Sequence, residues 1–309
     1  MPHIKHLPPL VKRFRTMVAG SMFSALGQSI DDLARQHGPA YGQSFESHLE
    51  LLIRAFPELP FPDWAVNGFI RLNREIVREE RLFRQQGRYS AGPEIFDTIV
   101  TEVYSNPEVM EHHYLVGLYL SYFLWPHHHE LWNFFGSEFL QKTPEPERFM
   151  EWGVGHGLLS LAALEAWPET QGEFYDISPF SLAFAHKLVT AYGFQQRCRL
   201  HQGDIIAQRP EPAPCILCGE LLEHLPDPGR LLDLLANSLT PWGQAFLTGA
   251  VNAPQRDHLH LFRTPEEVLQ MVRSHGLTIR RHLVTVHPNR RQDPLAPTVI
   301  AMVVERKKM

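Results

Sequence analysis

The stretch FMEWGVGHGLLSLAAL, residues 149–164, decides the expected fold, because three glycines in it join a short apolar run to a helical apolar pattern. Gly153, Gly155 and Gly157 stand at alternate positions between the two. Glycine is needed where a backbone turns sharply or comes close to a ligand. A strand, a glycine-rich turn and a helix N-terminus together form a common cradle for nucleotide-like ligands. The turn alone does not identify the ligand.

The pattern of the chain changes near residue 143. Before it, apolar residues recur at helical spacing, as in EIFDTIVTEVY (94–104), and strand-like alternation is scarce. After it, strand and helix patterns alternate, which predicts a mostly parallel sheet covered by helices and ending in an antiparallel hairpin. We therefore expect an α/β fold with an all-helical cap domain, 1–143, and a Rossmann-like domain, 144–309. The predicted strands cover 148–153, 172–178, 197–204, 214–220, 243–250, 277–287 and 297–306.

The composition argues against several classes of protein. A net charge of -5 is unlike that of a general nucleic-acid binder, which usually carries a basic face. No apolar stretch reaches the length of a membrane span. Three cysteines cannot staple a chain of 309 residues, so we expect a reducing, cytoplasmic location. The expected partner is a small molecule rather than a nucleic acid or a membrane.

From about residue 148 to residue 306, the chain resembles the class I S-adenosylmethionine (SAM)-dependent methyltransferases in motif order and in number of elements. MEWGVGHG (150–157) is similar to their first motif, YDISPFSLAFA (175–185) to the second and HQGDII (201–206) to the third. CGELLEHLPDPGRLL (218–232) resembles the segment after strand four in small-molecule methyltransferases of the ubiquinone-biosynthesis type. The resemblance implies the seven-stranded class I sheet and SAM as the cofactor.

A dinucleotide is the rival cofactor, because it also uses a glycine turn and an acidic residue about 20 positions later. The antiparallel end hairpin, the Gly-Asp pair after the third strand and the Leu-Glu-His segment favour SAM.

The resemblance also implies which residues bind SAM. The glycine turn would lie under the methionine part, and a carboxylate ending the second strand would accept from both ribose hydroxyls. An acidic residue after the third strand would accept from the adenine amino group, with an apolar neighbour packed on the ring. The implied residues are Glu151, Gly153, Gly155, Gly157, Asp176, Ile177, Asp204, Ile205 and Glu220.

Ligands of open parallel sheets bind beyond the carboxyl ends of the strands, which nominates the residues after strands four and five for the chemistry. A hydroxyl or amine acceptor often has to lose a proton, and histidine suits that step near neutral pH. We take His224, His258 and Glu220 as candidates for the catalytic base. The alternative for Glu223 and His224 is that they only cap the following helix.

The sequence predicts no metal site. His127, His128 and His129 are consecutive, so on a helix they point in different directions and are expected to have separate packing and surface roles. Cys215 and Cys218 have a zinc-like spacing but lie on a predicted buried strand without a second pair, which favours core packing. The one constellation with iron or zinc character is Asp257, His258 and His260 together with His224.

The helical half is rich in aromatic residues between positions 104 and 135. In the family that the chain resembles, such a segment usually lies over the SAM pocket, where aromatic faces would stabilise the sulfonium and exclude water. The lid candidates are Tyr114, Tyr119, Tyr122 and Trp125. The same helices could instead pack as a core or form a homodimer interface.

The leading hypothesis is methyl transfer from SAM to a small molecule in the biosynthesis of a secondary metabolite. The second is a SAM-cyclising enzyme, resembling the azetidine-2-carboxylate synthases, that converts SAM into azetidine-2-carboxylate and methylthioadenosine. The third is a non-catalytic SAM-binding subunit. The acceptor and the oligomeric state stay open.

Overall fold

The computed structural model describes residues 7–307, so the first six residues of the expected cap domain and the last two of the Rossmann-like domain lie outside it. Seven strands form one sheet in the order β3-β2-β1-β4-β5-β7-β6. Strands β1 to β5 run parallel, whereas β7 pairs antiparallel with both β5 and β6. The expected sheet and its terminal antiparallel hairpin are confirmed. The strands are β1 (Arg148–Trp152), β2 (Gln171–Asp176), β3 (Cys198–Gln202), β4 (Ala213–Cys218), β5 (Leu239–Val251), β6 (Leu277–Val286) and β7 (Thr298–Arg306).

Helices precede the sheet and alternate with its strands. The helices before β1 are α1 (Pro9–Ala19), α2 (Ala25–His37), α3 (Pro39–Ala55), α4 (Asp63–Gln86), η2 (Pro93–Ile95), α5 (Phe96–Ile99), η3 (Val100–Tyr104), α6 (Pro107–Val109), η4 (Met110–Tyr114), α7 (Leu115–Leu124), α8 (Pro126–Phe134) and η5 (Phe135–Leu140). Those after β1 are α9 (Leu158–Ala166), α10 (Pro179–Ala191), η6 (Gln195–Arg197), α11 (Ile205–Gln208), η7 (Leu222–His224), α12 (Pro228–Ser238), α13 (Pro265–Ser274) and η8 (Pro288–Arg290). Within residues 7–307, no helix has both the length and the apolar character to cross a bilayer.

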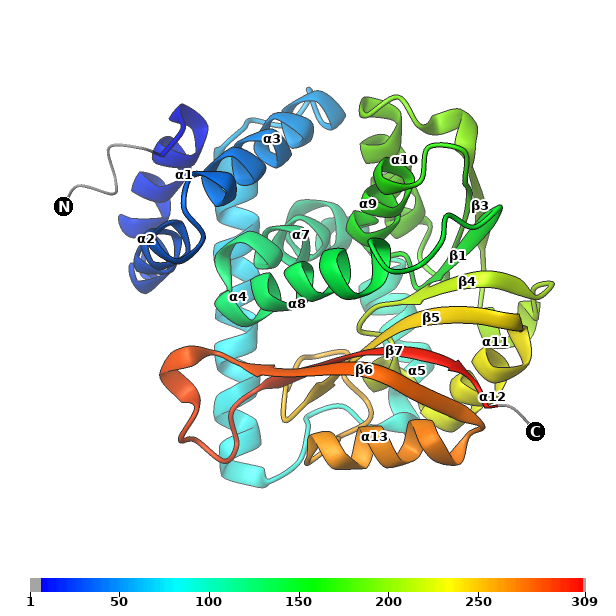
Figure 1. Ribbon diagram of the computed structural model, residues 1–309. Helices are drawn as coiled ribbons and strands as arrows, with labels where there is room; N and C mark the ends of the chain where they lie inside the picture. The colour runs from blue at the N-terminus through cyan, green and yellow to red at the C-terminus, as the bar shows by residue number, and fades with distance from the viewer. Residues whose placement is uncertain (1–6, 308–309) are drawn as a thin grey trace.

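Buried side chains of the sheet belong to two cores, one on each face. On β1, Phe149 joins the first core, whereas Met150 and Trp152 join the second. Successive side chains of a strand point to opposite faces, so a strand covered on both faces is apolar throughout. Helices α12 and α13 pack on the second core, and α9 and α10 pack on the first (Figure 1).

The N-terminal helices share the first core with the sheet. Phe45 of α3 stacks on Phe123 of α7 with ring centroids 5.2 Å apart, and Phe135 of η5 packs on Phe246 of β5 at 4.7 Å. Helices α7 and α8 lie between the long α4 and the sheet (Figure 1). The expected boundary at residue 143 falls in the connection from η5 to β1, and the division into two domains stays a prediction.

The turn between β1 and α9 requires a left-handed backbone. The φ angles of Gly153, Gly155 and Gly157 are +67°, +51° and +72°, a region that side-chain-bearing residues rarely adopt. A Cβ atom at Gly157 would lie 2.6 Å from the Cβ of Ala185 on α10. The third glycine therefore lets α9 begin in close contact with α10.

We expect Gly157→Ala to lower the free energy of unfolding by about 3 kcal/mol, because it adds a steric clash to backbone strain. Urea denaturation measures this loss. The matched control is Gly193→Ala, where φ is +90° but no atom would lie within 4 Å of the new Cβ. There we expect only the strain cost, about 1 kcal/mol. Equal losses in the two variants would show that contact with Ala185 is not what requires glycine.

Candidate active site

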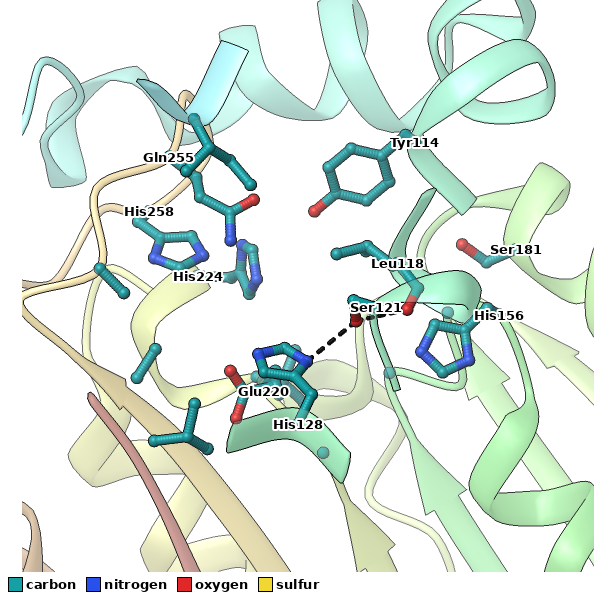
Figure 2. A pocket seen from close by; sticks show the side chains of 18 of the residues that line it. Tyr114, Leu118, Ser121, His128, His156, Ser181, Glu220, His224, Gln255 and His258 are labelled. Carbon is teal, nitrogen blue, oxygen red and sulfur yellow. Dashed lines mark hydrogen bonds between the residues drawn. The ribbon is translucent and has the colours of Figure 1, made fainter. Parts of the chain in front are cut away.

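A cavity of about 390 Å³ lies beyond the carboxyl ends of β1 to β5. One side is formed by the glycine turn and the segments that follow the strands, and the other by α4, η4, α7 and the start of α8. This is where ligands bind in open parallel sheets. Figure 2 shows side chains from both parts around the cavity, among them Tyr114, Ser121, His128, His156, Glu220, His224 and His258.

Asp176, the last residue of β2, fastens the glycine turn. Its carboxylate accepts the backbone N–H of Gly155 through Oδ2 at 2.9 Å and that of Ser178 through Oδ1 at 2.8 Å. Burial raises the pKa of Asp176 to about 6, against the lowering effect of these hydrogen bonds. The carboxylate lines the cavity, so it stands where the sequence predicts a ribose-binding acid.

Glu151 is a buried carboxyl beside the same turn. It accepts a hydrogen bond from the Ser160 hydroxyl at the start of α9. Burial raises its pKa to about 8, although the Ser160 hydrogen bonds lower it. Glu151 is therefore protonated across much of the neutral range while the site holds no cation.

Most of the other residues predicted to bind SAM line the cavity, but one of them does not. Ile177, Asp204 and Ile205 line the cavity, and Asp204 also caps α11, since its Oδ1 accepts the Ile206 N–H at 2.9 Å. Gly157 is not among the lining residues, because it stands at the start of α9 and faces Ala185. Sequence reasoning could not separate the ligand-facing glycines from the packing one. Their roles toward SAM stay predictions.

Glu220 follows β4 in a strained conformation. Its φ is +48°, and its backbone N–H donates to the Thr248 hydroxyl at 2.7 Å. The same hydroxyl donates to the Glu220 carboxylate at 2.7 Å. Burial raises the pKa of Glu220 to about 7. Left-handed non-glycine residues cost about 1–3 kcal/mol and concentrate at functional sites, which supports a functional role for this turn.

His224 is held in one tautomer by residues from two other segments. Its Nδ1 lies 2.9 Å from the Tyr104 hydroxyl, 3.1 Å from the Asp257 carbonyl oxygen and 3.4 Å from Asp257 Oδ2. The Tyr104 hydroxyl itself donates to Asp257 Oδ2 at 3.1 Å, so every group facing Nδ1 accepts. The proton of the neutral ring is therefore on Nδ1, and Nε2 keeps its lone pair.

Asp257 is fully buried beneath this histidine and also accepts a hydrogen bond from the Tyr114 hydroxyl. Burial works to raise its pKa, but His224, His258 and the two tyrosines outweigh it and lower the pKa. Asp257 is thus an ionised carboxylate that orients His224.

Glu223 and His258 complete the group of polar residues after β4 and β5. Both are buried, and one ligand atom each from Glu223, His224 and His258 lies within 4.8 Å of the others. Burial, reinforced by repulsion from Glu220, raises the pKa of Glu223 well above its ordinary range. Burial lowers the pKa of His258 to about 3, so its ring is neutral near pH 7. We call Glu223, His224 and His258 the triad cluster.

The remaining histidines and the cysteines occupy separate positions. His260 packs its ring on Phe262 with centroids 4.5 Å apart and is outside the triad cluster, although it belonged to the one grouping with metal-like character in the sequence. His128 and His129 are buried, so a surface role is wrong for both; their Nδ1 atoms meet the Ser121 hydroxyl and the Tyr122 carbonyl. The two cysteines of β4 are buried in different cores, as expected for core packing.

Three of the four lid candidates line the cavity, namely Tyr114, Tyr122 and Trp125. Tyr119 does not: its hydroxyl contacts His48 Nδ1 on α3, and its ring packs on Phe123 with centroids 6.0 Å apart. Helical spacing shows that these side chains are neighbours but not which of them meets the cavity.

Several lining residues were missed by the sequence prediction. His156, Tyr104 and Ser181 all line the cavity. The position of His156 between two glycines of the turn was a usable signal. Tyr104 offered none, because its hydrogen-bond partner Asp257 is 153 positions away.

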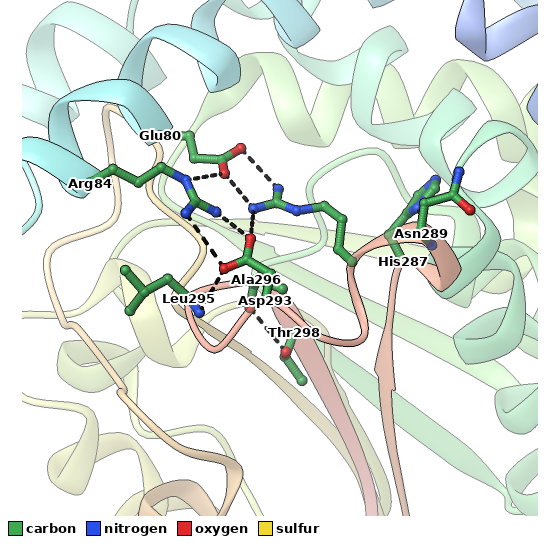
Figure 3. A network of polar contacts seen from close by, with 9 residues as sticks. Glu80, Arg84, His287, Asn289, Asp293, Leu295, Ala296 and Thr298 are labelled. Carbon is green, nitrogen blue, oxygen red and sulfur yellow. Dashed lines mark hydrogen bonds and ion pairs between the residues drawn. The ribbon is translucent and has the colours of Figure 1, made fainter.

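A network of four charged residues lies at the cavity wall, since Glu80 and Arg290 are lining residues. Figure 3 shows Glu80 and Arg84 of α4 beside Asp293 of the loop between β6 and β7. Arg290, in the loop between β6 and β7, donates to Glu80 of α4 at 2.5 and 3.0 Å and to Asp293 at 2.7 Å. Arg84 pairs with both Glu80 and Asp293. The network fastens the β6–β7 loop to α4.

Residues 125–281, just over half of the chain, match the family model described as a methyltransferase domain. The ubiquinone biosynthesis O-methyltransferase of Xylella fastidiosa (strain 9a5c) is 32% identical over 102 residues, covering 33% of this chain and 41% of that protein. The protein of the same name from Pseudomonas fluorescens is 25% identical over 174 residues, covering 50% and 74%. The chain thus spans about two fifths of the length of the Xylella relative.

Among solved structures, the mitomycin 7-O-methyltransferase MmcR has a TM-score of 0.50 and 17% identity, covering 81% of this chain and 70% of that one. At this identity the likeness concerns the fold.

The raised pKa of Glu151 predicts how stability changes with pH. A carboxyl whose pKa is about 8 when folded and near 4.5 when unfolded binds more protons in the folded state. Its contribution is complete below about pH 4.5 and is lost progressively up to about pH 8. We expect the free energy of unfolding of the wild type to fall over this range relative to that of Glu151→Gln, in urea denaturation at a series of pH values. A pH-independent difference would contradict the assignment.

Proposed function

The chain belongs to the methyltransferase domain family, which uses SAM, and on that premise we propose that it transfers the methyl group of SAM to a small molecule. The observation that carries the proposal is one cavity lined both by the glycine turn with Asp176 and by His224 and His258. A methyltransferase needs this continuity, because the donor carbon and the acceptor atom must meet without leaving the protein.

SAM binds at the carboxyl ends of β1 to β3 in this proposal. The Asp176 carboxylate, which already accepts the N–H groups of Gly155 and Ser178, lines the cavity and is offered to the ribose hydroxyls. Asp204 uses Oδ1 to cap α11, which leaves Oδ2 for the adenine amino group, and buried Ile205 offers an apolar surface to the ring. Glu151 and Glu220 line the same cavity and provide carboxylates for the α-ammonium group.

The aromatic side chains of the helical part cover the donor. Tyr122 and His156 line the cavity and lie with ring centroids 5.4 Å apart. Aromatic faces attract a cation such as the sulfonium of SAM. Burial lowers the pKa of His156 to about 3, so it adds no competing positive charge. A covered site also keeps water from the reactive methyl carbon.

The acceptor lies against His224 and attacks the methyl carbon from the side opposite to sulfur. The new bond forms with the acceptor's lone pair, and the electrons of the carbon–sulfur bond stay on sulfur, giving S-adenosylhomocysteine. A hydroxyl acceptor also releases its proton to water. His224 holds that hydroxyl, because its Nε2 lone pair faces no donor among the contacts that fix the ring.

The rest of the acceptor site is mostly apolar. Side chains of α2, α4 and β7 contribute Leu26, Ile76, Val77 and Val299 to the lining. Such surroundings favour a compact, largely apolar acceptor with a reactive hydroxyl. The named activity of the Xylella relative, O-methylation in ubiquinone biosynthesis, supports oxygen as the acceptor atom and a role in biosynthesis, here of a secondary metabolite.

Replacement of Asp176 tests the donor site. We expect Asp176→Ala to weaken SAM binding about tenfold to a hundredfold in calorimetry, because hydrogen bonds to a charged group contribute about 1.5–3 kcal/mol. The control is Glu169→Ala, an exposed carboxylate in the loop before β2. Circular dichroism verifies that both variants fold. Wild-type affinity in Asp176→Ala would remove this residue from the donor site.

The reaction is tested with methyl-labelled SAM and a panel of small phenols, enols and hydroxy acids. We expect label transfer and S-adenosylhomocysteine only when an acceptor is present. His224→Ala should reduce turnover about a hundredfold through lost positioning, with the Kd for SAM unchanged. The exposed His186→Ala is the control.

Incubation with SAM alone separates the cyclisation hypothesis from methyl transfer. Methylthioadenosine and azetidine-2-carboxylate above the uncatalysed background would replace the proposed function. SAM binding without any turnover across the panel would favour the non-catalytic subunit.

A further inference from the structure

We propose that the triad cluster, Glu223, His224 and His258, binds one divalent transition-metal ion to which the acceptor oxygen coordinates. The metal site is argued from the geometry of the cluster. Only the role of the acceptor rests on the proposed function.

The three residues meet from two loops at adjacent strand ends. Glu223 and His224 belong to η7 after β4, and His258 belongs to the loop after β5. These loops are joined by the backbone, since the N–H groups of Leu259 and His260 donate to the Glu223 carbonyl at 2.8 and 3.0 Å. The ligand atoms lie within 4.8 Å of one another, so small side-chain rotations suffice to place all three about 2 Å from one ion.

Glu223 is the strongest single indication. Its side chain is fully buried, and neither carboxylate oxygen accepts a hydrogen bond of good distance and angle from residues 7–307. Only weak backbone contacts, from the Glu223 and Ala250 N–H groups, act to lower its pKa. Nδ1 of buried His258 and Oδ1 of Asp257 are likewise without a partner in the described part of the chain. Buried polar atoms are costly unless they are hydrogen-bonded or coordinate a cation. One ion between Glu223 and His258 would satisfy both residues.

His224 is oriented as metal-bound histidines usually are. Its Nδ1–H is held by Tyr104 and by the carbonyl and carboxylate oxygens of Asp257, which leaves Nε2 as the ligand atom. With the ion bound, the acceptor hydroxyl coordinates the ion instead of hydrogen-bonding to Nε2. A carboxylate behind the imidazole fixes the tautomer and raises the basicity of the ligand nitrogen. Tyr114 in turn donates to Asp257, so the outer groups are themselves held in place.

The donor set selects the kind of ion. Two imidazole nitrogens and one carboxylate suit Zn²⁺, Fe²⁺, Co²⁺ or Ni²⁺, whereas Mg²⁺ and Ca²⁺ prefer oxygen ligands. Three protein ligands leave coordination positions open, and His224 and His258 both face the cavity. A hydroxyl or enol oxygen bound there loses its proton to water more readily, as a metal-bound water does. The oxygen then attacks the methyl carbon, and the ion is unchanged. The substrate class is therefore an acceptor with an ionisable hydroxyl or enol.

The first test uses Co²⁺ alone as the probe on the full chain, after treatment with a chelator. We expect one equivalent to bind in calorimetry, with visible d–d absorption typical of nitrogen and oxygen ligands. Glu223→Gln keeps the shape of the side chain and should weaken Co²⁺ binding at least about a hundredfold, as should His258→Ala. The matched control, His260→Ala, should bind like the wild type, because its ring packs on Phe262.

Thermal unfolding guards against variants that fail to fold. Co²⁺ should raise the Tm of the wild type and of His260→Ala but not that of Glu223→Gln, since an ion that binds only the folded state stabilises it. The metal site would be overturned if the wild-type chain did not bind Co²⁺, or if Glu223→Gln bound Co²⁺ as tightly as the wild type.

The metal site and the proposed function fail in different ways. Full methyl transfer by metal-free chain would overturn the metal proposal and leave the methyltransferase intact. Stoichiometric Co²⁺ binding at the triad cluster with no transfer to any acceptor would uphold the site and contradict the proposed function.

Discussion

The carboxylate of Asp176 is the constraint on which the cavity depends. It joins the turn after β1, through Gly155, to the segment that leads into α10, through Ser178. Ser178 also caps α10 and donates to the Tyr104 carbonyl of the helical part at 2.6 Å. One side chain therefore fixes the relative positions of two strand ends, a helix start and the segment that carries Tyr104. Burial raises the pKa of Asp176, because it disfavours the charged carboxylate. The backbone N–H groups of the turn act in the opposite direction, since they donate hydrogen bonds to the charged form.

The acceptor side is organised differently, because its polar groups are only partly satisfied. Asp257 is fixed by two tyrosines from the helical part and stays ionised, whereas Glu223 has no comparable partners in residues 7–307. The pKa of Asp257 is lowered and that of Glu223 is raised. Strongly shifted pKa values of neighbouring carboxyl groups are typical of functional sites. The helical part is thus needed for the site itself and not only for covering it.

The fold and half of the site could be predicted because their signals are local. The glycine turn, Asp176 and the alternation of strands and helices are each visible within about 30 residues, the size of one βαβ unit. The contacts Tyr104–Asp257 and Glu80–Arg290 join positions 153 and 210 apart, and no spacing rule connects them. The sequence named His258 as a base candidate but could not separate it from His260 in the possible metal grouping, because a loop without regular periodicity does not fix which side chains turn inward.

The shared core of the helices and the sheet decides how a ligand enters. If α7, α8 and η5 swung away from the sheet as a rigid lid, Phe135, Phe246 and their neighbours would be exposed to water at large cost. The β6–β7 loop is joined to α4 in another way, by ion pairs among the partly buried residues Glu80, Arg84, Arg290 and Asp293. The attachment of the β6–β7 loop to α4 is therefore the part of the cavity wall whose strength we expect to fall as ionic strength rises.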